Sequence, residues 1–313
     1  MAVATFDPQY RAATEAVAVL DRSERGKLAV SGPQAAEFLD ALLSNDVAGL
    51  QPGGGVDATL LTHKGRMLAE VRVLRTEDEL ALDTERVALQ ALFDALHRFR
   101  VGYEVEVHKR TLSHGLLSLI GPGCDAVLAS PPGPAEHENR TAILDGHAVR
   151  LVRTDLGVDV LCERAHTAAV ATALERAGAT AIAEAVAEAI RIEHGRPRFG
   201  VEIDADTMPQ EAGIHGRAVS YSKGCYVGQE TVARLYWKGR PNRHLRGLRL
   251  SAPLAPDTPL LLGDEQVAVI GSAADSPRLG PIALALVRRE AEPGALLVTA
   301  DGAIQATVVE LPF

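Results

Sequence analysis

The feature that most constrains the fold is a change of pattern near Arg243. Before it, short β-like runs alternate with stretches that have apolar residues at helical spacing, which is typical of domains that pack helices on sheets. From Arg243 to Phe313 the chain shows only short β-like runs separated by Pro, Gly and Asp. We therefore predict an α/β region followed by a small β-barrel or sandwich.

Several elements are well marked in the first part. Val56–Thr62 and Met67–Leu74 are predicted to form a hairpin with a basic tip, His63–Arg66. Arg86–Phe99 has the apolar spacing of an amphipathic helix. Gly121–Arg140 is rich in Pro, Gly and Ala and is predicted to be an exposed loop. Farther along, two Ala-rich helices are expected at residues 165–177 and 180–194.

Length and composition indicate a soluble protein of two or three compact units. The chain has 313 residues, of which 47% are hydrophobic and 23% charged. No apolar run is long enough to cross a bilayer, and Met1–Arg11 lacks the pattern of a signal peptide, so we expect a cytoplasmic protein. The cysteines Cys124, Cys162 and Cys225 form no ligand cluster, and we predict neither a disulfide nor a metal site.

Charge is distributed unevenly. The formal net charge is −9, which argues against general affinity for nucleic acid. The segment from Arg217 to Arg249, however, contains six Arg and two Lys but only one acidic residue, Glu230. Such a segment can supply a cationic groove for a small polyanion, or it can be a solvated face whose Arg stems cover apolar surface.

The segment Ser222–Glu230 carries the strongest chemical signal. Gly224 and Gly228 flank Cys225 and allow tight turns, and a helix is expected to begin at Gln229. A helix N-terminus and the neighbouring Lys223 both favour the thiolate, so Cys225 and Lys223 are the candidate catalytic residues. A free cysteine is also commonly a buried small hydrophobe, and the residues leave both roles open.

Upstream, Glu202 follows a run rich in Arg, Gly and Pro. A carboxylate on such a loop can accept paired hydrogen bonds from the amino-pyrimidinone edge of a pterin. The alternative is an ordinary surface charge, the commoner place for Glu.

The string Lys223–Glu230 resembles the signature of YgfZ-type proteins, relatives of the glycine-cleavage T-protein that support iron–sulfur cluster assembly or repair. The resemblance extends over nearly the whole chain. Its further landmarks, in the expected order, are Asp21–Gly32, Phe38–Leu39, Asn45–Val47, Leu61–Thr62, Lys64–Arg66 and Arg191–Glu202.

This resemblance implies a GcvT-like α+β architecture of three domains around a central folate site. The expected boundaries are 1–110 for a ferredoxin-like α/β folate-binding unit, 111–240 for a second α/β unit and 241–313 for the β-barrel, with possible interleaving of the first two. It also implies that Glu202 holds the pterin of tetrahydrofolate and that the residues after Cys225 line the cleft. The remaining residues assigned to the folate are Tyr226, Gln229, Arg234, Lys64 and Arg66, with Arg234 for the tail carboxylate because guanidinium binds carboxylate in a bidentate fork.

The sequence departs from the T-protein at one point. Where the T-protein has an acidic pair after the hairpin tip, this chain has Ala69 and Glu70. The first hypothesis is therefore a tetrahydrofolate-binding accessory protein with iron–sulfur client or assembly partners. The second is a folate-dependent aminomethyl or one-carbon transferase, for which Asp21, Asp46 and Glu70 are the candidate acids or bases. The third is a pterin- or RNA-binding module without chemistry.

Overall fold

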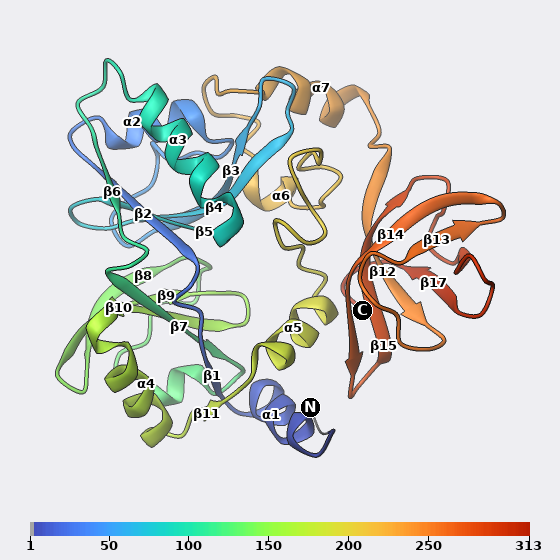
Figure 1. Cartoon of the computed structure of the whole chain (residues 1–313). Helices are drawn as coiled ribbons and strands as arrows, with labels where there is room; N and C mark the ends of the chain where they lie inside the picture. Colours follow the sequence, from blue (N-terminus) through green and yellow to red (C-terminus); the bar gives the residue numbers. More distant parts are fainter. Residues whose placement is uncertain (1–2) are drawn as a thin grey trace.

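The computed structural model describes residues 3–313, which form two sheets with helices and a separate barrel (Figure 1). The predicted α+β architecture with a terminal β unit is confirmed, and the β unit is a closed barrel. Within the described residues, no helix is both long and apolar enough to span a membrane.

The first sheet has five antiparallel strands. In sheet order they are β3 (Gly55–Leu61), β4 (Met67–Arg75), β5 (Leu80–Thr84), β2 (Gly26–Ser31) and β6 (Glu106–Lys109). The helices α2 (Ala35–Leu42) and α3 (Leu89–Phe99) contribute to its core, with Phe38, Leu92 and Leu96 fully buried. The predicted helix 86–99 begins as a short 3₁₀ turn, η1 (Arg86–Ala88).

The second sheet has six strands, one of which, β1, comes from the start of the chain. In sheet order they are β11 (Thr180–Ala181), β1 (Ala18–Asp21), β7 (His114–Ile120), β10 (Gly157–Glu163), β9 (His147–Arg153) and β8 (Asn139–Leu144). Because β1 pairs with β7 and β11, the predicted unit 1–110 loses its N-terminal segment to the second sheet. Local pattern predicts a strand but not the sheet that it joins.

Three elements around this sheet differ from the prediction. The helix α1 (Val3–Glu15) contains Pro8 and was not expected. The loop predicted for 121–140 contains the 3₁₀ turn η2 (Cys124–Val127) and ends in β8, which pairs with β9. The helix predicted from residue 180 begins only at α5 (Glu184–Glu193), because Thr180 and Ala181 pair in parallel with β1. The preceding helix is the 3₁₀ turn η3 (Arg164–His166) followed by α4 (Thr167–Arg176).

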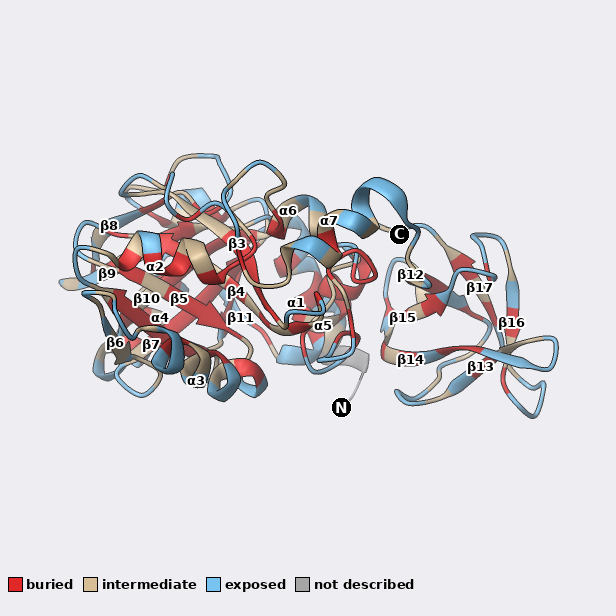
Figure 2. Cartoon of the chain, turned by 90° about the horizontal axis from the view of Figure 1, so that it is seen from above, coloured by how far each residue is buried: buried red, intermediate tan, exposed pale blue. Residues whose placement is uncertain are grey.

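The barrel forms a separate lobe that is joined to the body through α5 and a long connection (Figures 1 and 2). Its strands, in order, are β12 (Arg243–Leu250), β15 (Gly280–Arg288), β14 (Glu265–Ser276), β13 (Pro259–Leu262), β16 (Leu296–Val298) and β17 (Gln305–Val309). Ile192 of α5 packs with Leu245, Ile282 and Leu284 of the barrel. The connection carries the short helices α6 (His215–Ala218) and α7 (Gln229–Lys238).

Candidate functional site

A cavity of about 230 Å³ lies where the first sheet, the second sheet and α5 meet. Nine carboxylates and seven arginines line it, so its walls are charged and pair extensively with one another. A second, larger cleft of about 1020 Å³ runs between α1, α5 and the barrel. There the buried Glu193 accepts hydrogen bonds from Tyr10 and Ser276 and pairs with Arg278, so its oxygens already have partners.

One wall of the central cavity is an ion-pair network that joins the two sheets. Arg72 of β4 donates to Asp159 of β10 at 2.6 Å and approaches Asp83 of β5 at 3.5 Å, while the Nε of Arg25 donates to Asp83 at 2.9 Å. Burial alone would raise the pKa of Asp83, but the Arg25 and Arg72 guanidinium groups outweigh it and lower that pKa. Ser118 also donates to Asp159 at 2.7 Å. Asp83 therefore stays ionised at neutral pH.

Glu70 differs from its neighbours because, among the described residues, its carboxyl group has neither an ion pair nor a hydrogen bond. It lies on β4 opposite Thr59 of β3 and lines the cavity. Burial raises the pKa of Glu70 to about 7, the charge of Asp57 adds to this, and Arg217 and Arg25 oppose it. A carboxyl group with this pKa exchanges its proton near neutrality and can serve as a general acid or base.

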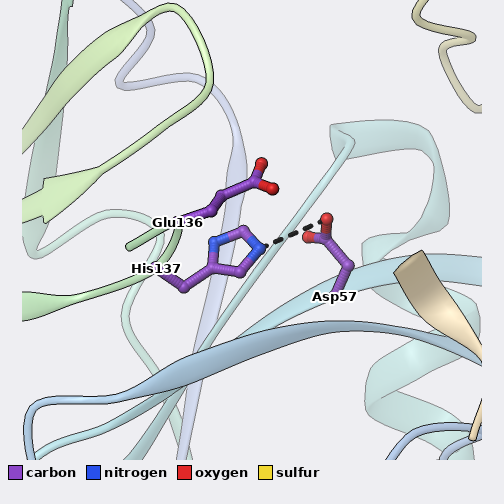
Figure 3. A group of neighbouring side chains, drawn as sticks. All are labelled: Asp57, Glu136 and His137. Atoms are coloured by element: carbon purple, nitrogen blue, oxygen red, sulfur yellow. Dashed lines mark ion pairs between the residues drawn. The ribbon is translucent and has the colours of Figure 1, made fainter. Parts of the chain in front are cut away.

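An acidic cluster with a histidine lines the same cavity as Glu70. Figure 3 shows its three side chains, Asp57, Glu136 and His137. Nε2 of His137 lies 3.3 Å from a carboxylate oxygen of Asp57, and Glu136 is next to it, with all three candidate ligand atoms within 4.8 Å of one another. The Nε of Arg217 donates to Asp57 at 2.7 Å, and its Nη2 donates to Glu136 at 2.6 Å. Burial would raise the pKa of Asp57, but the hydrogen bond and charge of His137 and the charge of Arg217 lower it to about 2. Because the guanidinium group of Arg217 already provides the positive charge between Asp57 and Glu136, the cluster is an ion-pair site.

Cys225 is exposed, whereas Cys124 and Cys162 are buried. The segment that carries it depends on Gly228, whose φ is +85° and where a Cβ would collide with the backbone oxygen of Thr62 in the hairpin tip. Glycine is thus the residue that allows this segment to close against the hairpin. Cys225 does not line the central cavity.

The side chain of Lys223 is buried and bonded to the end of α2. Its side chain is only 2% exposed and pairs with the carboxylate of Asp40 at 3.1 Å. Nζ also donates to the backbone oxygens of Leu43 and Asn45 at 3.0 Å each, and to that of Asp40. Burial lowers the pKa of Lys223 despite Asp40. The ammonium group thus binds the C-terminal end of α2.

Glu202 is likewise bonded within the protein. Its side chain is 0% exposed and pairs with Arg191 at 2.9 Å. One oxygen accepts from Ser272 of the barrel, and the other accepts from the backbone N–H of Arg198 at 2.9 Å. Every acceptor is used inside the protein, so Glu202 joins α5 to the barrel and has no lone pair directed at a ligand.

The other predicted folate contacts also lie outside the central cavity. Lys64 and Arg234 are exposed, Gln229 is half-buried, and Arg66 donates to the backbone oxygen of Asp206. Tyr226 is buried, and among the described residues its hydroxyl has no hydrogen-bond partner. The structure therefore groups these residues around the hairpin tip and α7, away from the charged cavity.

Of the three predicted acids or bases, only Glu70 reaches the cavity. Asp21 and Asp46 are exposed and accept hydrogen bonds from the backbone N–H groups of Ser23 and Gly49, both at 2.8 Å, as turn residues do. The sequence contains a signal for the cavity: Glu70 and Arg72 alternate with buried apolar residues along β4. Two charged side chains on one face of a central strand indicate a polar interior.

Comparison with known proteins gives the family. The chain matches the GCVT N-terminal domain over residues 3–223 and the glycine cleavage T-protein C-terminal barrel domain over residues 243–313. It is 30% identical over 298 residues to an aminomethyltransferase of Mycobacterium tuberculosis, covering 90% of this chain and 80% of that protein. It is 29% identical over 319 residues to an aminomethyltransferase of Streptomyces coelicolor, covering 94% and 86%.

A more distant relative is a putative chloroplastic transferase of Arabidopsis thaliana, 26% identical over 308 residues, with 95% of this chain and 71% of that protein covered. Among solved structures, the glycine cleavage system aminomethyltransferase T of Bartonella henselae has the same fold, with a TM-score of 0.87 at 24% identity over 98% of this chain and 89% of that one. The chain thus belongs to the glycine-cleavage T-protein (GCVT) family, with the family's N-terminal domain and its C-terminal barrel.

Proposed function

We propose that this protein binds a tetrahydrofolate and, through the thiol of Cys225, supports the assembly or repair of iron–sulfur proteins. The observation that carries the proposal is the position of Cys225: it is exposed, on a glycine-built segment, within residues 224–242, which neither family domain covers. An exposed thiol outside the two matched domains favours a role beyond the one those domains supply.

The central cavity is the proposed folate site. At about 230 Å³ it is smaller than the roughly 300–1,000 Å³ of pockets that enclose whole drug-sized ligands, so it suits the bicyclic pterin with the tail outside. Among the described residues, the carboxyl group of Glu70 lines this cavity without an ion pair or a hydrogen bond, and its carboxylate matches the paired N–H donors of the amino-pyrimidinone edge.

The rim of the cavity supports the same ligand. Arg196 and Arg198 line it with side chains 37% and 31% exposed. Arg196 pairs with Asp155 and Arg198 with Glu85, Glu184 and Glu188, so a folate-tail carboxylate would share or replace these partners. In this arrangement they take the role predicted for Arg234. A bound reduced folate would supply an amine nitrogen that carries one-carbon groups.

The test is complementation of a strain that lacks the gene. We expect Cys225→Ala to abolish support of iron–sulfur enzyme activity while tetrahydrofolate affinity changes less than a few-fold, because the thiol lies outside the cavity. Ser222→Ala is the control, since this exposed side chain belongs to the same segment. Full complementation by Cys225→Ala would refute the thiol role.

The second candidate function is aminomethyl transfer to folate. Glu70 favours it, because a carboxyl group with a pKa of about 7 facing the cavity can move a proton at a folate nitrogen. Turnover of an aminomethylated carrier protein with tetrahydrofolate, absent in Glu70→Gln, would establish this activity. If the unmodified protein shows no turnover, the aminomethyltransferase function is refuted and the accessory function remains the proposal.

A further inference from the structure

The helix α7 presents an exposed aromatic pair that the proposed site does not use. Trp237 is 69% exposed and Tyr236 is 46% exposed, and Trp237 is the only tryptophan of the chain. Val232 is the one buried residue of the helix. Figure 2 shows α7 on the connection between the body and the barrel, with its C-terminal end in the exposed colour. Large aromatic rings held in water in this way are typical of interaction sites.

The two rings are ordered by the protein. Tyr236 stacks on Tyr221 with ring centroids 4.0 Å apart, and Trp237 meets Tyr236 edge-on at 4.8 Å. The hydroxyl of Tyr221 accepts a hydrogen bond from Gln210 at 3.3 Å, which ties the stack to the body. Because the rings are already positioned, binding a partner would cost little of their conformational entropy.

Cations surround the pair. Arg234, Lys238 and Arg240 are exposed, and in the part of the chain that the structure describes none of them has an ion-pair partner. Arg234 and Lys238 are four residues apart and so share one helix face. The protein as a whole has a net charge of −9, so this is a local positive surface on an acidic molecule.

We propose that this surface, the α7 patch (Arg234, Tyr236, Trp237, Lys238 and Arg240), docks a protein partner that presents carboxylates around an apolar side chain. Trp, Tyr and Arg are the residues that dominate binding energy at protein interfaces, and the unpaired cations require acidic complements. The inference deepens the proposed function, because the segment with Cys225 leads directly into α7, whose length of about 15 Å brings a docked partner near the thiol.

A single-stranded nucleic acid is the competing occupant, and two observations disfavour it. The net charge of −9 opposes a polyphosphate at long range. One face of Tyr236 is already covered by Tyr221, which removes a stacking surface for a base.

The test uses the purified full chain and a dye-labelled synthetic peptide of alternating glutamate and leucine. We expect binding that weakens with salt and shifts the emission of Trp237 to shorter wavelength, because the ring leaves water. Trp237→Ala and Lys238→Glu should each reduce affinity by about tenfold or more. The matched control is Arg98→Glu with Phe99→Ala on α3, an exposed cation next to an aromatic ring that is 45% exposed.

Three outcomes would overturn the docking proposal. The first is that the peptide leaves the emission of Trp237 unchanged. The second is that the α3 control variant weakens peptide affinity as much as the α7 variants do. The third is that an oligothymidylate binds as tightly as the peptide, which would make the patch a nucleic-acid site. Peptide binding does not involve folate or cellular complementation. If the peptide does not bind and Cys225→Ala does not complement the strain, the docking surface alone is refuted. If the peptide binds and Cys225→Ala complements fully, the thiol role alone is refuted.

Discussion

Glu202 lies in a segment that resembles a family landmark and Glu70 lies where the sequence departs from the T-protein, and their surroundings give the two acids opposite roles. Glu202 has a guanidinium group, a hydroxyl and a backbone N–H for its two oxygens, whereas Glu70 has no described partner and a pKa of about 7. Sequence reasoning chose Glu202 because its loop context was visible. It undervalued Glu70 because burial by a second sheet is a tertiary effect.

We predict that Glu202→Gln lowers the free energy of unfolding by about 3 kcal/mol, the usual cost of breaking a buried ion pair. Urea unfolding measures this, and tetrahydrofolate affinity of the folded variant should stay within a few-fold. The control is Glu230→Gln, an exposed acid without an ion pair among the described residues. A variant of normal stability with impaired folate binding would restore the predicted pterin contact.

At the scale of elements, prediction succeeded where the determinants are local. The hairpin of β3 and β4 and the change to strands at Arg243 follow from period-two patterns and turn residues. Prediction from the sequence failed for α1, which contains Pro8. It also failed for β8 and β11, because their strand form depends on pairing with β9 and β1. The interleaved topology was expected only from the family resemblance.

The segment that leads into α7 provides a prediction at this scale. Gly228→Ala should cost about 1–3 kcal/mol, since a non-glycine residue is strained at a φ of +85° and its Cβ would strike the hairpin tip. It should also change the rate at which a thiol reagent modifies Cys225. Gly224→Ala is the matched control, because a Cβ there meets nothing within 4 Å. Equal stability of both variants would mean that the segment is not held by Gly228.

At the scale of the molecule, charged contacts join the lobes. Arg72 links the two sheets, Glu202 links α5 to the barrel, and Asp57 on β3 is paired with His137, which precedes β8, and with Arg217 of α6. Such pairs join residues far apart in the sequence, so no local pattern reveals them. This is why the charged cavity was missed although its strands were predicted.

Acid stability tests this arrangement. The folded pKa of Asp57, about 2, lies below the unfolded value of 3.8, so its stabilising effect is complete above pH 4 and is lost as the pH falls toward 2. The difference between the folded and unfolded pKa values of Asp57 corresponds to about 2 kcal/mol of free energy of unfolding. Asp57→Asn should therefore lower stability at pH 7 by roughly this amount and show a smaller loss between pH 4 and pH 2. Parallel acid curves for the two proteins would contradict the ion-pair assignment.

The central claim is that Glu70 holds the pterin in the cavity between the sheets. Calorimetric titration of tetrahydrofolate at pH 6, 7 and 8 tests it most directly, because a carboxylate with a pKa of about 7 accepts two N–H donors only once it is ionised. We predict that affinity rises with pH through neutrality in the unmodified protein. In Glu70→Gln the affinity should be about tenfold weaker, equivalent to about 1.4 kcal/mol, and independent of pH over this range. Equal affinity and the same pH profile in both proteins would place the folate elsewhere.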